Sequence, residues 1–236
     1  MNPSQARASA LASRYHRRMT PCETSALFDP DCTRCPRLAD FLAEVRGKHP
    51  EYHAKPVPPF GDPRARLLVV GLAPGMHGAN ATGRPFTGDH AGLLLYRTLH
   101  RFGFASREVS EHATDGLQLI DCRITNAVKC LPPANKPRPD EVTRCRDFLT
   151  AELRSVRTGG VLLALGRIAH ESLLRALGLR LQQFPFGHAR VHELETAQLR
   201  LVDSYHCSRY NTQTGRLTEA MFDQVFLSVR ALLAAS

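Results

Sequence analysis

Short runs of apolar residues recur along the chain, separated by stretches in which apolar and polar positions follow helical spacing. The clearest run covers residues 67–71, Leu-Leu-Val-Val-Gly, and is typical of a strand buried on both faces of a parallel sheet. Similar runs predict further strands over residues 124–128, 160–166, 189–194 and 199–204. The pattern therefore indicates a sheet whose strands are covered on both sides.

Between these runs, apolar residues return every three to four positions, as on the buried face of a helix. The predicted helices cover residues 37–46, 140–156, 168–177 and 217–233, with one more directly after Asp89, whose carboxylate suits a helix N-cap. Strands that alternate with helices favour an α/β fold with helices on both faces of the sheet. Ligands of such folds bind at the carboxyl ends of the strands.

The chain reads as one domain, residues 1–236, in which an arm precedes the core. Residues 5–18 are polar and rich in arginine with weak helical character, and prolines crowd residues 29–62. We expect residues 1–60 to pack as an N-terminal arm against an α/β core at residues 64–236. No apolar run approaches the roughly 18 residues that span a bilayer, and the first residues lack the apolar segment of a secretory signal. We therefore expect a cytoplasmic protein without a membrane partner.

The chain is strongly basic. It carries 31 Lys and Arg residues against 22 Asp and Glu residues, which gives a net charge of +9. Codon bias and a use of arginine for bidentate phosphate contacts are alternative causes of the small share of lysine, and codon bias does not explain the sign of the charge. The hydrophobic share of 43% is ordinary for a globular protein and excludes a disordered or fibrous chain. A basic protein of this size favours a polyanionic partner.

Seven cysteines occur in a chain without a secretory signal, where metal or cluster binding is a more natural use than disulfides. Cys32 and Cys35 form a close pair, separated by two residues, and Cys130 and Cys145 can complete a four-sulfur site. The spacing by itself leaves zinc, an iron–sulfur cluster and four free thiols as alternatives.

A glycine-rich loop follows the first predicted strand. Residues 71–89, GLAPGMHGANATGRPFTGD, lack both the ending of a Walker loop and the fingerprint of a dinucleotide-binding loop. They offer closely spaced backbone N–H groups, the amide of Asn80 and the ring of Phe86. Backbone N–H groups stabilise a developing anion, and an aromatic ring stacks on a planar base. The loop is therefore a candidate site for chemistry on a base.

This loop resembles the first motif of the uracil-DNA glycosylase superfamily in its B-type, family 5 form. Residues 124–137, ITNAVKCLPPANKP, are similar to the middle motif, and residues 205–218, YHCSRYNTQTGRLT, to the last motif. The cysteine spacing also matches the four ligands of that family's 4Fe-4S cluster, and the resemblance extends from about Cys32 to Phe222. It implies a three-layer α/β/α fold around a central, mainly parallel four-stranded sheet.

The resemblance also implies a monofunctional DNA repair glycosylase. Such an enzyme flips uracil, or another deaminated base such as hypoxanthine or xanthine, out of DNA. It then hydrolyses the N-glycosidic bond and leaves an abasic site. The family further implies DNA as the partner, a monomer, and a 4Fe-4S cluster held by Cys32, Cys35, Cys130 and Cys145.

The matching positions imply roles for individual residues. His206 would donate a hydrogen bond to the departing base, and Asn80 would orient a water because an amide cannot act as a general base. Asp89 and Asp121 are the reserve candidates for the role of Asn80. The residues expected to form the base pocket are Gly71, Ala73, Pro74, Gly75, Phe86 and Asn126. The residues expected to contact DNA are Arg84, Lys129, Lys136, Ser208, Arg209 and Tyr210.

Two positions depart from the family pattern. Cys207 stands where proline is usual, and Gly75 replaces the commoner alanine, so the substrate range and rate stay open. An iron–sulfur protein that binds damaged DNA without turnover is the alternative function. A redox or zinc-binding protein that binds no nucleic acid is a third hypothesis, and the positive charge argues against it.

Overall fold

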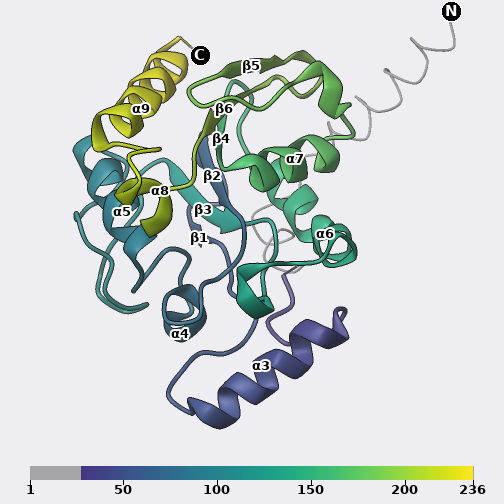
Figure 1. The fold of residues 1–236 in the computed structure, drawn as a ribbon. Coiled ribbons are helices and arrows are strands. Elements are labelled where there is room, and N and C mark those ends of the chain that lie inside the picture. Colours follow the sequence, from purple (N-terminus) through teal and green to yellow (C-terminus); the bar gives the residue numbers. More distant parts are fainter. Residues whose placement is uncertain (1–27, 236) are drawn as a thin grey trace, which may run out of the picture.

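The centre of the fold is a six-stranded sheet with the strand order β1-β3-β2-β4-β6-β5. It is seen in a computed structural model that describes residues 28–235 (Figure 1). The strands are β1 (Phe60–Gly61), β2 (Leu67–Gly71), β3 (Cys122–Asn126), β4 (Val161–Leu165), β5 (Val191–Leu194) and β6 (Leu199–Ser204). β3, β2, β4 and β6 run parallel, whereas β1 and β5 pair antiparallel at the edges. The predicted parallel centre is confirmed, and two antiparallel edge strands extend it.

Three predicted strands have different boundaries: β4 covers Val161–Leu165 rather than residues 160–166, and β3 and β5 differ for local reasons. β3 begins at Cys122 because its register with β2 pairs that residue with Leu67, and it ends at Asn126. β5 begins at Val191, since Ala189 has a φ of 58°, outside the β region. β1 has only two residues, too few for periodicity to indicate a strand.

The predicted helices are present with boundaries that their caps explain. Asp89 caps α5 as expected, because its side chain accepts the Gly92 N–H at 2.9 Å. Thr218 caps the last helix, which therefore begins at residue 219 rather than 217. The helices are α3 (Pro36–Lys48), α4 (Ala79–Thr82), α5 (His90–Arg101), α6 (Pro139–Ser155), α7 (Arg167–Ala176), α8 (Arg209–Gln213) and α9 (Glu219–Ala234). The short helices α4 and α8 were not predicted, since one turn carries no amphipathic pattern.

Two helical layers cover the sheet. α5 and α9 lie on one face, while α6 and α7 lie on the other (Figure 1). Along β2, Leu67 and Val69 join the core under α5 and α9, whereas Leu68 and Val70 join the core under α6 and α7. Successive side chains of a strand point to opposite faces, so a strand buried on both faces needs the continuous apolar run seen here.

α3 lies apart from the sheet and packs on the loop after β3 and on α6 (Figure 1). Its apolar stripe, Leu38, Leu42 and Val45, shares a third core cluster with Val128 and Phe148. The weak helical character predicted for residues 5–18 lies outside the described residues. Within the part that is described, no helix has the length and apolar character needed to cross a membrane.

Candidate active site

A cavity of about 690 Å³ opens at the carboxyl ends of β2, β3 and β6. Three loops that are distant in sequence form its walls, as expected for a parallel sheet covered by helices. The predicted residues that line it are Ala73, Gly75, Phe86, Asn126, His206, Ser208 and Arg209. The cavity thus brings the three motifs together at the predicted edge of the sheet.

Phe86 and Asn126 meet at the end of β2 because Gly71 leaves room for both. A β-carbon on Gly71 would lie 2.4 Å from the Asn126 Oδ1 and 2.6 Å from the Phe86 Cζ. Phe86 itself has a φ of 55°, in the left-handed region, which costs about 1–3 kcal/mol for a bulky residue. The surrounding structure must therefore hold this ring in place.

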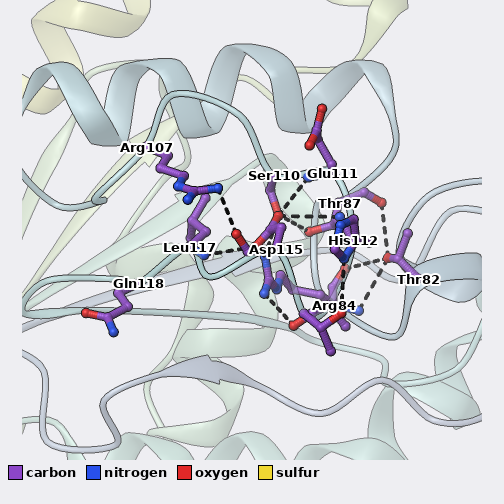
Figure 2. Close-up of polar contacts among 12 residues, drawn as sticks. Thr82, Arg84, Thr87, Arg107, Ser110, Glu111, His112, Asp115, Leu117 and Gln118 are labelled. Atoms are coloured by element: carbon purple, nitrogen blue, oxygen red, sulfur yellow. Dashed lines mark hydrogen bonds and ion pairs between the residues drawn. The ribbon is translucent and has the colours of Figure 1, made fainter.

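A buried polar network holds the segment that carries Phe86 (Figure 2). Arg84 pairs with Asp115 at 2.7 Å and donates to the Ala113 carbonyl at 2.6 Å. Ser110 accepts from Arg84 at 3.0 Å and lies 2.7 Å from the Thr87 hydroxyl. The segment around Phe86 is thus fastened to the loop that carries residues 110–115.

The structure corrects the DNA-contact role expected of Arg84. Only 4% of Arg84 is exposed, and its guanidinium is engaged in the ion pair and hydrogen bonds of the network around Asp115. Burial opposes ionisation of Asp115, but N–H donors from Leu117 and Glu111, together with Arg84, hold its pKa well below its usual range. Arg84 therefore holds the pocket segment in position and is not available to bind a DNA phosphate.

The structure corrects the same expectation for Lys129. Its side chain is 1% exposed, and its ammonium pairs with Glu152 at 2.7 Å. The same ammonium donates to the Asn126 carbonyl at 2.9 Å and contacts the Thr125 hydroxyl. Lys129 therefore fixes the backbone that presents Asn126 to the cavity.

The His206 ring lies 5.9 Å from the Phe86 ring, centroid to centroid, with 29° between the planes. Burial lowers the pKa of His206 to about 4, so the ring is neutral at neutral pH. A neutral imidazole keeps one N–H donor, which can face a developing negative charge in the cavity. Cys207 beside it is fully buried, and burial raises the pKa of its thiol, which does not suit a nucleophile.

Asn80 does not line the cavity. Its side chain is fully buried, its Nδ2 donates to the Met76 carbonyl at 3.4 Å, and its Oδ1 has no partner among the described residues. Gly71 and Pro74 are also buried and outside the lining. Lys136 and Tyr210 are exposed, with Tyr210 at 70%.

The cavity also contains residues that the sequence analysis did not assign to the pocket. Those with polar or titratable side chains are His77, Asp89, His90 and Asn135. Asp89 closes the first motif and is a reserve candidate for the role of Asn80, although its position before a predicted helix favours a helix cap. The structure shows that Asp89 both caps α5 and lines the cavity.

Four free cysteines line one small cavity beside α3. Cys32 and Cys35 precede α3, Cys130 follows β3, and Cys145 lies on α6. No three of these four sulfur atoms lie within 4.8 Å of one another. Burial raises the pKa values of the Cys130 and Cys145 thiols, so a cationic group would be needed to hold them as thiolates. The four cysteines thus come from three segments of the chain that meet at this cavity.

Comparison with known proteins agrees with this geometry. The family model described as "Uracil DNA glycosylase superfamily" matches residues 58–230. The type-5 uracil-DNA glycosylase of Thermus thermophilus is 47% identical over 206 residues, covering 85% of this chain and 93% of that protein. The type-5 enzyme of Mycobacterium bovis is 44% identical over 220 residues, covering 89% of this chain and 81% of that protein.

A type-4 relative is more distant. The type-4 uracil-DNA glycosylase of Archaeoglobus fulgidus is 33% identical over 153 residues, covering 64% of this chain and 69% of that protein. The matched region contains every strand of the sheet and all three loops around the cavity. From these matches, the chain belongs to the uracil DNA glycosylase superfamily and is most similar, among these relatives, to the type-5 enzymes.

Proposed function

We propose that the protein hydrolyses the N-glycosidic bond between uracil and deoxyribose in DNA and leaves an abasic site. The observation that carries this proposal is the juxtaposition of Phe86, Asn126 and His206 in one cavity of a uracil DNA glycosylase superfamily chain. No lysine occurs among the described residues that line the cavity. This favours hydrolysis by water over attack by an amine, and hence a monofunctional enzyme.

Each of the three residues has a role that its chemistry supports. The target base must leave the stack to reach the cavity, and Phe86 would stack on the flipped ring. The Asn126 amide both donates and accepts hydrogen bonds, so it can read a base edge. As the glycosidic bond breaks, its electron pair moves onto the base, and the neutral His206 ring would donate a hydrogen bond to that anion.

The same cavity supports a substrate range beyond uracil. Its volume of about 690 Å³ exceeds what a pyrimidine requires, and Gly75 places no side chain in its wall. Hypoxanthine and xanthine are the deaminated bases that we propose as additional substrates. We propose that the enzyme acts as a monomer, as the resemblance to the family implies.

The DNA backbone would be held by residues at the rim of the cavity. After the two corrections above, the remaining candidates are Lys136, Ser208, Arg209 and Tyr210. Ser208 and Arg209 line the cavity directly, and the exposed Tyr210 follows them on α8. Exposed cations beside an aromatic side chain suit a strand whose base has been extruded.

The test is base release from a duplex oligonucleotide that contains one uracil. We expect strand breaks after alkali with uracil, and also with hypoxanthine and xanthine, whereas the matched duplex with thymine should stay intact. Tight binding to uracil-containing or abasic DNA without release of any of these bases would contradict the proposal. It would favour the alternative of a damage-binding protein without turnover.

We further propose that Cys32, Cys35, Cys130 and Cys145 hold a 4Fe-4S cluster. In a tetrahedral zinc site the sulfur atoms lie about 3.8 Å apart, as follows from Zn–S bonds of about 2.3 Å. The four sulfur atoms here are spread more widely than that, which favours a larger group with several metal ions. When bound, the cluster would tie α3 to the loop after β3 and to α6.

The cluster proposal predicts iron and inorganic sulfide in equal amounts, with visible absorption, in protein purified without air. A Cys130→Ser/Cys145→Ser variant should lose the absorption, because two of four thiolate ligands are gone. A Cys122→Ala variant should keep it, since Cys122 lies in the main core away from this cavity. One zinc ion per chain and no iron would contradict the proposal.

A further inference from the structure

Asp89 lies in the wall that separates the cavity from a neighbouring recess of about 380 Å³. Its Oδ1 accepts the Gly92 N–H at 2.9 Å and so begins α5. Its Oδ2 faces the first loop, where a β-carbon on Gly75 would lie 3.5 Å away and one on Gly78 only 2.6 Å away. The carboxylate can therefore approach this loop as closely as it does only because residue 78 is a glycine, whereas a β-carbon on residue 75 would make an ordinary contact.

Among the described residues that line the cavity, Asp89 supplies the sole carboxylate. The alternative water-binding residue, Asn80, is fully buried, contributes nothing to the lining and carries an amide that cannot accept a proton. Asp121 is excluded by position. It pairs with Arg66 at 2.7 Å just before β3, at the opposite end of the sheet from the cavity.

We propose that Asp89 is the general base of the glycosylase reaction, an inference that rests on the proposed function. The C1′–N bond breaks first, and its electron pair leaves with the base. A water held by the Asp89 carboxylate then attacks C1′ and forms the new C1′–O bond. The proton of that water passes to Asp89 and then to solvent, while the departed base anion takes up a proton.

The surroundings of Asp89 suit this role. Burial raises the pKa of Asp89, and the N–H donors of Gly92 and Ala91 and the nearby His90 oppose the rise. A base must be ionised, so the rate should rise with pH through the pKa of Asp89 and then level off. The other titratable and charged groups that line the cavity or the recess, or interact with Asp89, are His77, His90, Glu111, His206, Cys207 and Arg209.

The decisive variant is Asp89→Asn. Asparagine caps a helix as well as aspartate does, so α5 and the melting temperature should be preserved. Under single-turnover conditions, uracil release should fall about 100-fold or more, and the acid limb of the pH–rate profile should disappear. Affinity for a duplex that carries a non-hydrolysable uracil nucleoside should stay unchanged, because DNA binding does not require a general base.

Asp121→Asn is the matched control, since it makes the same chemical change at the far end of the sheet, and it should keep the wild-type rate and pH profile. Wild-type activity of Asp89→Asn would overturn the inference. So would a slower variant that keeps the acid limb, because the limb would then belong to His206, whose pKa is about 4. Failure of the wild-type protein to release uracil would instead refute the proposed function itself, and it is measured before any variant.

Discussion

A Lys129→Met variant is expected to lose about 3–5 kcal/mol of its free energy of unfolding. The substitution removes the cation that forms an ion pair with Glu152 at 2.7 Å and leaves that carboxylate buried without this direct partner. The Oε2 of Glu152 has no hydrogen-bond partner among the described residues, so the bond from Lys129 to Oε1 is not backed by a second bond on the same carboxylate. Urea unfolding followed by circular dichroism measures the loss.

The double variant Lys129→Met/Glu152→Leu is the control for this prediction. Replacing both members of a buried pair by apolar residues is often neutral, so most of the lost stability should return. A single Lys129→Met variant within about 1 kcal/mol of the wild type would show that the pair is solvated in solution, since exposed pairs contribute that little.

The same protein tests the correction to the DNA contacts. Each phosphate contact adds about 0.9 to the slope of log affinity against log salt concentration. The ammonium of Lys129 is buried and bonded within the protein. The slope of log affinity against log salt concentration should therefore be the same for the double variant and the wild type. A slope reduced by one contact would restore Lys129 to the DNA interface.

A His206→Ala variant is expected to release uracil about 100- to 1,000-fold more slowly, the usual cost of losing one donor to a developing anion. The ring lies in the cavity beside Phe86, and its pKa of about 4 keeps it neutral above that pH. The loss should therefore be constant between pH 6 and 8. Single-turnover kinetics with the uracil duplex measure it, and DNA affinity should change far less than the rate.

Two further variants sharpen this result. His206→Gln keeps an N–H donor on a shorter and more flexible side chain, so it should retain part of the lost rate. His112→Ala removes an exposed histidine from a loop outside the cavity and should behave as wild type. An unchanged rate in His206→Ala would assign the stabilisation of the anion to another group, such as the backbone N–H donors of the first loop.

Local patterns were enough to predict the sheet and the position of the site. The run at β2 is apolar at every position because both faces of that strand are buried, and burial of this kind is visible in a few consecutive residues. The loops after β2, β3 and β6 meet in one cavity because the strands are parallel. Asn126 ends β3 and His206 closely follows β6, so both could be placed at this edge of the sheet from sequence. Phe86 lies well beyond the end of β2, and only its motif placed it in the pocket.

The sequence by itself determined the order of the longer strands and helices along the chain, the family and the residue types available to the site. Only the tertiary structure decided which charged groups remain exposed and available to contact DNA. Arg84 and Asp115 are 31 positions apart in the sequence, and Lys129 and Glu152 are 23 positions apart, so neither ion pair appears in any local pattern. A cation is stably buried only where the fold brings a partner within hydrogen-bond distance, because only such a partner offsets the free energy lost when the cation leaves water.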